Sequence, residues 1–154
     1  MKSSLNKNPE TQSDINENYS VPIFGYELLR DILIPDLLGK ETSEITYWAG
    51  KHLARKFSVD SLEDSESFFL DAGWGQLDLI NEAKNEMKLE LTGDIVKRRF
   101  QMLADPCFRL EAGFIAQQVQ SQKQAVTEAF EEISKKQNKV IFTVRWDLKD
   151  PIIK

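Results

Sequence analysis

Apolar residues recur at helical spacing in the stretch 24–39, where the patterned part of the chain begins. They fall at i, i+4, i+5, i+8 and i+9, a stripe typical of an amphipathic helix. Pro35 disfavours helix at Ile34, so this helix is expected to end or kink there. Gly39 is the expected C-terminal stop.

The stretch 42–57 shows a second helical pattern. Thr42 or Ser43 is its expected N-terminal cap. The buried face is expected to hold the apolar residues Ile45, Trp48, Ala49, Leu53 and Phe57. Gly50 costs about 1 kcal/mol relative to alanine inside a helix, so it predicts the close approach of another helix.

A short third helix is expected to begin at Ser61 or Ser65 and to end at Gly73, where the chain changes its period. The string Gly73-Trp74-Gly75 then leads into an alternating stretch. A phosphate-binding loop needs a strand before its glycines and a helix after them, and here the order is reversed. The string is therefore predicted to be a turn into a β-hairpin, with Trp74 closing one end of the core.

Two stretches alternate apolar and polar residues with the period of half-buried strands. The first predicted hairpin turns at 81–86, and its apolar face holds Leu77, Leu79, Met87, Leu89 and Leu91. The second turns at 135–139, and its apolar face holds Val126, Phe130, Val140, Phe142, Val144 and Trp146.

Two more helices are expected between the hairpins, within 92–103 and 105–122. On the first, the basic run 97–99 is expected to be a solvated face. On the second, Asp105 is the expected cap and Pro106 the first helical residue. Gly113 again indicates close packing.

The predicted order is helices, hairpin, helices, hairpin. Two hairpins with apolar inner faces make a twisted, four-stranded antiparallel sheet covered on one side by about five helices, which is an α+β fold. At 154 residues the chain is expected to form a single domain over 21–150. A flexible polar tail is expected at 1–20, and a short C-terminal tail at 151–154.

Charge and composition exclude several classes of function. A net charge of −5 leaves no strongly basic surface for nucleic acid. No apolar run approaches the ~20 residues that span a bilayer, and the polar N-terminus lacks the apolar core of a signal peptide. The single cysteine, Cys107, cannot form an internal disulfide. A cytoplasmic protein with no nucleic-acid or membrane partner is therefore expected.

Few residues suggest catalysis. Cys107 is expected at the second position of its helix, where backbone amides can stabilise a thiolate; a buried, inert thiol is the alternative. His52 could pair with Cys107, but nothing in the sequence orients the two side chains. One histidine and one cysteine are too few for a zinc site, so no metal or other cofactor is expected. On a strand, Glu128 and Glu132 share a face while Glu131 points away, and a solvated strand face is expected for these glutamates.

Five strings, in this order and at this spacing, resemble the YslB family, an uncharacterised group of small cytosolic proteins of Gram-positive bacteria. They are GYELLRDILIPDLLG, EITYWAGKHLARKF, FFLDAGWGQLDLI, FRLEAGFIAQQVQ and KVIFTVRWD. The resemblance covers roughly Val21 to Asp150. The YslB family in turn resembles the vinyl-reductase-type ligand-binding domain, whose relatives include TRAPP vesicle-tethering subunits, NO-signalling ligand-binding domains and phenol-responsive sensors.

The resemblance implies a helix layer on a twisted sheet, a homodimer formed through helices, and an apolar ligand cavity. Many of those sensor domains carry additional cysteines near the last hairpin, where this chain has glutamates, so a metal site is not carried over. Some TRAPP relatives carry a lipid on a cysteine, which leaves acylation of Cys107 an open question.

Together these features predict a non-enzymatic homodimer that binds a small apolar molecule in a helix-lined pocket. The expected pocket residues are Tyr47, Trp48, Phe69, Trp74, Cys107, Phe108 and Phe114. The main alternative is a protein–protein interaction module whose core is filled by its own side chains and holds no ligand. A further alternative is a cysteine-dependent enzyme that uses Cys107 and His52.

Overall fold

A computed structural model describes residues 19–152, without the side chains of 149 and 150. The chain divides into two compact units, Met1–Gly39 and Lys40–Lys154, which are described separately. Most of the expected N-terminal tail, residues 1–18, lies outside the described residues, as do residues 153 and 154 of the expected C-terminal tail.

The first unit is helical from Ile23 onward. Its elements are α2 (Ile23–Glu27), the π-helical η1 (Leu28–Leu33) and α3 (Ile34–Leu38), followed by the 3-10 turn η2 (Gly39–Glu41). Ile34 remains helical, and its N–H bonds to the carbonyl of Leu29, five residues back. The helix therefore widens to π spacing before Pro35 instead of ending there, which accommodates a residue that has no N–H. Gly39, at φ 60°, ends α3 as predicted.

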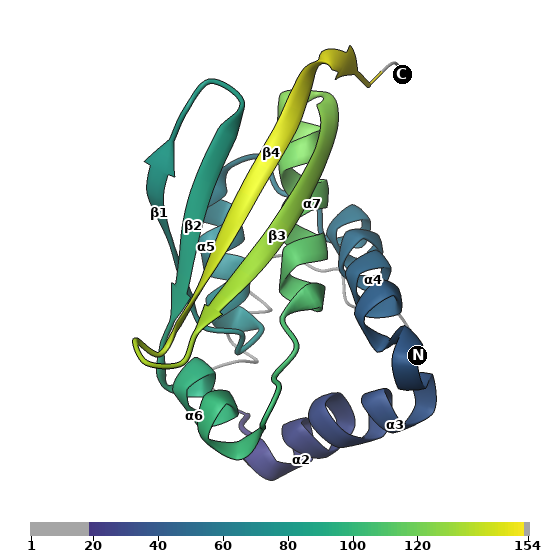
Figure 1. Cartoon of the computed structure of the whole chain (residues 1–154), viewed down its shortest axis with the longest axis vertical. Coiled ribbons are helices and arrows are strands. Elements are labelled where there is room, and N and C mark those ends of the chain that lie inside the picture. The colour runs from purple at the N-terminus through teal and green to yellow at the C-terminus, as the bar shows by residue number, and fades with distance from the viewer. Residues whose placement is uncertain (1–18, 153–154) are drawn as a thin grey trace. The chain divides into compact units, whose positions relative to one another are not determined.

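The second unit contains one antiparallel sheet in the order β1-β2-β4-β3, as Figure 1 shows. Its strands are β1 (Gln76–Glu82), β2 (Glu86–Thr92), β3 (Ala125–Ser134) and β4 (Lys139–Pro151). Each predicted hairpin forms, and the two join through β2 and β4, where Leu89 pairs with Phe142. The predicted four-stranded sheet is confirmed.

The inner face of the sheet holds the apolar residues predicted for β2 and β4, and all of them are buried. On β3 the inward residues are instead Ala125, Thr127 and Ala129. Val126 and Phe130 are exposed on the other face, so their predicted inward position was wrong. The small inward side chains let a helix lie against β3, and a strand's alternation then turns the larger residues outward.

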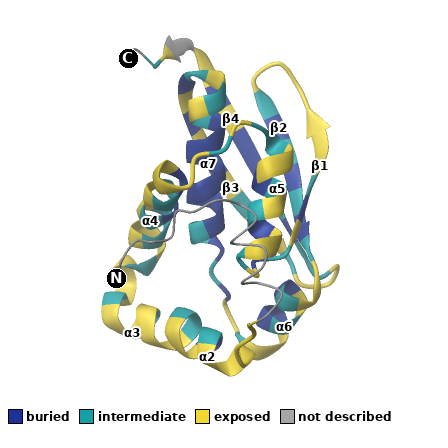
Figure 2. Cartoon of the chain, turned by 180° about the vertical axis from the view of Figure 1, so that it is seen from behind, coloured by how far each residue is buried: buried dark blue, intermediate teal, exposed yellow. Residues whose placement is uncertain are grey.

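The helices of the second unit cover the inner face of this sheet. They are α4 (Thr42–Lys56), α5 (Leu62–Asp71), α6 (Asp94–Met102) and α7 (Arg109–Lys123). Helix α7 packs against both α4 and β3, and residues 111–119 are all buried, which Figure 2 shows as the dark run along that helix. A helix buried on every side in this way forms the centre of the unit.

Glycines let α4 and α7 approach to backbone contact. A Cβ atom on Gly50 would lie 2.1 Å from the carbonyl oxygen of Leu110, and one on Gly113 would lie 2.0 Å from that of Tyr47. The close packing predicted at both glycines is confirmed. Helix α4 thus buries Gly50 and Ala54, whereas Ile45, Trp48 and Phe57 of the predicted buried face are exposed.

Local signals at helix ends were only partly predictive. The Oγ of Ser61 accepts the N–H of Asp64, so the predicted cap of α5 is confirmed. Helix α4 has Glu41 at its N-cap without a side-chain bond, so the predicted cap at Thr42 or Ser43 was wrong. Gly73, at φ 73°, follows the end of α5 and begins the predicted turn into β1.

Buried Gln118 on α7 completes the C-terminal end of α4. Its Nε2 donates to the carbonyl of Phe57 at 2.8 Å, and its Oε1 accepts the N–H of Val59 at 3.2 Å. The first bond satisfies a carbonyl that the end of a helix leaves without a partner, and the second holds the chain just after the helix. A polar residue therefore stands in the middle of the core for a structural reason that helical periodicity does not reveal.

Candidate functional site

The expected pocket residues separate into three places. Phe69, Trp74 and Phe114 belong to an aromatic cluster in the core. Tyr47, Cys107 and Phe108 surround a corner between α4, the loop 103–108 and the start of α7. Trp48 lies on the exposed side of α4, where 58% of its surface is accessible.

The aromatic cluster is built by α5, the Gly73–Gly75 turn and α7. Trp74 meets Phe69 and Phe114 edge-on, with ring centroids 5.0 and 5.5 Å apart. Phe68 stacks on Phe114 at 4.5 Å. These are favourable aromatic geometries, so the rings pack against one another. The prediction that Trp74 closes the helix–sheet core beside a turn fits this arrangement.

Cys107 lies in the loop 103–108, because α7 begins only at Arg109. The predicted helix start at Asp105 and Pro106 was therefore wrong, and so was the place of Cys107 in a first helical turn. In this loop the Cys107 carbonyl accepts a hydrogen bond from Nη2 of Arg99 on α6 at 2.9 Å, in place of the backbone N–H that it would accept inside a helix. The Arg99 guanidinium also lies 4.4 Å above the Phe108 ring, which holds the loop against α6.

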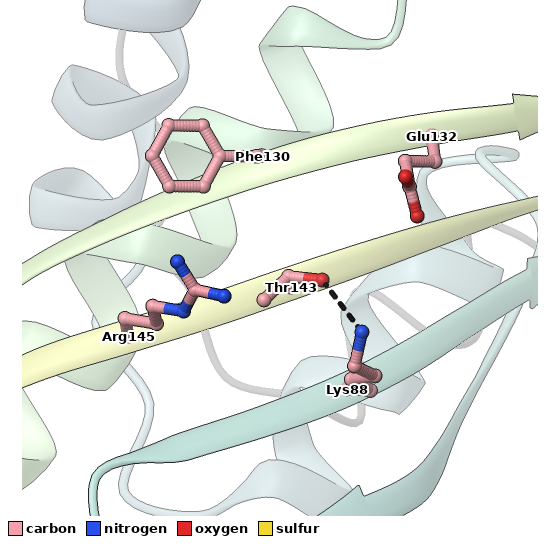
Figure 3. Close-up of a pocket in the computed structure, with 5 residues that line it drawn as sticks. All are labelled: Lys88, Phe130, Glu132, Thr143 and Arg145. Carbon is pink, nitrogen blue, oxygen red and sulfur yellow. Dashed lines mark hydrogen bonds between the residues drawn. The ribbon is translucent and has the colours of Figure 1, made fainter.

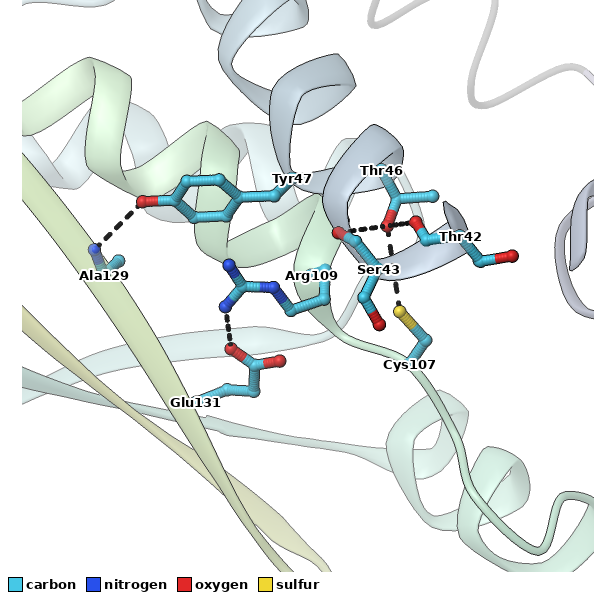
Figure 4. A network of polar contacts seen from close by, with 8 residues as sticks. All are labelled: Thr42, Ser43, Thr46, Tyr47, Cys107, Arg109, Ala129 and Glu131. Atoms are coloured by element: carbon cyan, nitrogen blue, oxygen red, sulfur yellow. Dashed lines mark hydrogen bonds and ion pairs between the residues drawn. The ribbon is translucent and has the colours of Figure 1, made fainter. Parts of the chain in front are cut away.

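The Cys107 thiol is half-buried and faces α4. Its Sγ lies 3.8 Å from Oγ1 of Thr46, whose hydroxyl also donates to the carbonyl of Thr42 (Figure 4). We call the residues around this thiol the Cys107 corner, and they are Thr46, Tyr47, Arg99, Cys107, Phe108, Arg109, Glu111 and Glu131.

Two charged residues of the Cys107 corner are almost completely buried. Arg99 is 3% exposed and Glu111 is 1% exposed, and Nη1 of Arg99 lies 3.9 Å from Oε2 of Glu111. The predicted solvated basic face on α6 was therefore wrong for Arg99. Arg99 follows Val96 by three residues and directly precedes Phe100, so all three lie on the buried side of α6. Helical periodicity in the sequence could have indicated this position.

A second set of polar contacts links the Cys107 corner to the edge strand β3. The Tyr47 hydroxyl accepts the N–H of Ala129 at 3.2 Å, and the Arg109 guanidinium lies 4.1 Å above the Tyr47 ring. Nη1 of Arg109 bonds to Oε1 of Glu131 at 2.7 Å (Figure 4). Burial raises the pKa of Tyr47, although the Ala129 N–H and Arg109 oppose that rise.

Glu131 therefore points inward, on the face opposite to Glu128 and Glu132 as predicted, but its side chain is only 14% exposed, so its expected solvation was wrong. Glu128 and Glu132, at the alternate positions of β3, are exposed as predicted. The difference follows from the strand period, because neighbouring residues point to opposite faces of the sheet.

Trp48 and His52 lie side by side on the exposed side of α4. Their rings stack at 5.5 Å with an interplanar angle of 9°. Within residues 19–152, no hydrogen bond joins His52 to Cys107, so the structure does not bring the thiol and the imidazole together as a reacting pair.

The described residues place two limits on the chemistry. Among them, no three His, Cys, Asp or Glu side chains gather closely enough to hold a metal ion. Nor does any helix in that part of the chain combine the length and apolar character needed to cross a membrane. The Cys107 corner brings together a half-buried thiol, aromatic faces and two buried charges.

Comparison with known proteins identifies relatives along nearly the whole chain. The family model described as protein of unknown function (DUF2507) matches residues 23–145. The uncharacterized protein YslB of Bacillus subtilis (strain 168) is 43% identical over 152 residues, which cover 99% of this chain and 100% of that protein. The resemblance seen in the sequence strings is thereby confirmed.

Two solved structures share the fold. A vinyl-4-reductase family protein from Methanocaldococcus jannaschii matches with a TM-score of 0.67 and 18% identity, over 96% of this chain and 99% of that chain. The phenol-responsive sensory domain of the transcription activator PoxR, determined with phenol, matches with a TM-score of 0.58 and 11% identity, over 95% and 92%. At these identities the likeness confirms the expected α+β fold.

Proposed function

The chain belongs to the DUF2507 family of proteins of unknown function, and from that premise we propose that it is a non-enzymatic domain that binds a small apolar molecule and acts as a homodimer. The shared fold supports the first half of this proposal, because the PoxR sensory domain is a phenol-responsive protein of the same architecture. The Cys107 corner supplies the place for the ligand.

The observation that carries the proposal is the buried pair of Arg99 and Glu111 beside a half-buried thiol. Burying two charges is costly, and hydrophobic replacements of such pairs are often as stable. A role in ligand binding accounts for keeping them. The apolar body of the ligand would lie against Tyr47 and Phe108, and Cys107 would supply a soft contact.

Reaction of the thiol tests this placement, because Cys107 is the only cysteine. Phenol, used as the probe, is expected to slow the labelling of Cys107 by a thiol reagent, with saturation. N-acetylcysteine in the same buffer is the control for any direct effect of phenol on the reagent. A labelling rate that stays constant as phenol is raised to about 10 mM, a concentration that saturates millimolar sites, would count against a ligand in the Cys107 corner.

The exposed side of α4 supports the homodimer. Trp48 and Ile45 stand one turn apart and are both exposed, and large aromatic residues are enriched in protein interfaces. Trp48 would therefore contact a second copy and not the ligand. Trp48→Glu is expected to yield monomers in analytical ultracentrifugation, whereas Trp48→Phe keeps the dimer. A wild-type chain that sediments as a monomer would refute this half of the proposal.

The alternative function is a protein–protein interaction module with no ligand. The mutual contacts of Phe68, Trp74 and Phe114 favour it, because these rings fill the space between α5 and α7 with the chain's own side chains. The two functions differ in the labelling experiment, since an interaction module without a ligand site shows no protection of Cys107 by phenol.

A further inference from the structure

The face of the sheet that no helix of the second unit covers contains a hollow of about 240 Å³. It lies across β2, β4 and β3 and is lined by Lys88, Phe130, Glu132, Thr143 and Arg145, as Figure 3 shows. We call it the outer hollow. The sheet separates it from the Cys107 corner, so it is independent of the ligand site proposed above.

Strand register builds the outer hollow. Lys88 and Phe130 both pair with Thr143, which places the three residues in one row across the sheet. Arg145 lies two residues along β4 from Thr143, and Glu132 lies two residues along β3 from Phe130. Thr143 is only 9% exposed although it points away from the helices, because its longer neighbours stand around it. It forms the floor.

The charges around the outer hollow are not all paired. Nε of Arg145 bonds to Oε1 of Glu86 at 2.7 Å, and nearby Lys139 pairs with Glu90 at 3.3 Å. In the described part of the chain, by contrast, neither Lys88 nor Glu132 has an ion-pair partner. The Lys88 ammonium donates instead to Oγ1 of Thr143 at 3.3 Å.

The outer hollow therefore presents a cation, a carboxylate, a hydroxyl and an aromatic wall, since Phe130 is 46% exposed. From this arrangement we propose that the outer hollow binds a small zwitterion with an apolar side group, of the free amino acid class. The ligand carboxylate lies at Lys88 and Thr143, and its ammonium lies at Glu132. Its side group packs on Phe130.

The size and exposure of the site set the expected affinity. A hollow of about 240 Å³ is smaller than the pockets that hold drug-sized ligands, and it suits a molecule the size of an amino acid. Exposed ion pairs contribute little free energy, so the dissociation constant is expected to be about 1 mM.

The experiment is a titration of the full chain with L-phenylalanine, followed by the backbone amide signals of Lys88, Phe130 and Thr143 in two-dimensional NMR. Saturable shifts at these amides are expected. Three analogues each lack one feature: 3-phenylpropionate lacks the ammonium, 2-phenylethylamine lacks the carboxylate and glycine lacks the ring. Each is expected to bind about threefold to fivefold more weakly than L-phenylalanine.

Variants test the assignment of the two charges. Lys88→Met and Glu132→Gln are each expected to weaken L-phenylalanine binding by about threefold to fivefold. Lys136→Met, in the exposed β3–β4 turn, is the matched control and is expected to leave it unchanged. Urea unfolding of each variant confirms that the fold is intact.

Three results would overturn the proposal. One is an absence of saturable shifts at the amides of the outer hollow up to about 20 mM L-phenylalanine, well above the expected dissociation constant. Another is equal affinity in wild type, Lys88→Met and Glu132→Gln. The third is shifts confined to Tyr47 and Cys107, which would exclude the outer hollow while supporting the ligand site in the Cys107 corner.

Discussion

The close contact of α4 and α7 at Gly50 and Gly113 predicts that a larger residue at either position destabilises the fold. In Gly113→Ala the new Cβ would lie 2.0 Å from the carbonyl oxygen of Tyr47, whereas ordinary contacts begin at 3.4 Å. In Gly50→Ala it would lie 2.1 Å from the oxygen of Leu110. Both obstacles are backbone atoms, which cannot rotate away. Either substitution therefore has to push the two helices apart by more than 1 Å.

The expected loss follows from two opposing effects. Replacing glycine by alanine inside a helix stabilises it by about 1 kcal/mol. Overpacking costs about 1 to 3 kcal/mol, and the upper value applies here because α7 is buried on every side between 111 and 119. The net result is a loss of about 2 kcal/mol in the free energy of unfolding, which lowers the Tm by about 4 to 8 °C in a chain of this size.

Urea unfolding followed by tryptophan fluorescence measures this loss. Gly25→Ala in α2 is the matched control, because a Cβ on Gly25 meets no atom within 4 Å. The control is expected to unfold at the wild-type urea concentration or slightly above it. If Gly50→Ala and Gly113→Ala also unfold at the wild-type urea concentration, α4 and α7 do not make the close backbone contact described at these glycines.

Further predictions concern the polar groups of the core. Glu111→Gln is expected to lower the free energy of unfolding by about 3 kcal/mol, because it removes the carboxylate charge 3.9 Å from the buried Arg99 guanidinium. The double variant Arg99→Met/Glu111→Met is expected to recover part of that loss, and an equal loss in the double variant would contradict this. Gln118→Leu is expected to cost about 2 kcal/mol in urea unfolding, since backbone groups at the end of α4 lose their partners; a wild-type midpoint would contradict it. Burial raises the pKa of Tyr47 above 10.0, so the folded chain holds this proton more tightly than the unfolded chain, and stability present below pH 10 falls as the pH rises above it. The stability difference between wild type and Tyr47→Phe is therefore expected to shrink from pH 8 to pH 11, and a constant difference would refute the role of Tyr47.

Much of the sheet could be predicted because its signals are local. Strict alternation from Val140 to Trp146 determines which residues of β4 face the helices, and the reversed order around Gly73–Gly75 excludes a phosphate loop. The close contact of α4 and α7 could be predicted for a similar reason. A glycine inside a helix is costly wherever it stands, so Gly50 and Gly113 indicate a contact without identifying the partner.

The sequence was misleading where distant contacts decide the outcome. Phe130 fits an apolar strand face by itself, but register with β4 and the small inward side chains of β3 place it outside. Asp105-Pro106 is a good helix start, yet the bond from Arg99 to the Cys107 carbonyl is associated with an extended loop. The Cys107 corner could not be assembled from the sequence, because its members come from α4, α6, the loop 103–108, α7 and β3.

Mass spectrometry of protein expressed in Bacillus subtilis, the source of the 43%-identical relative, tests the proposed ligand-binding homodimer most directly. Native and denaturing spectra of one preparation are compared. We predict a native dimer that carries additional mass of a small molecule, released when the protein is denatured. A chain without additional mass in both spectra, whether monomer or dimer, would contradict the ligand-binding proposal and would favour the protein–protein interaction module.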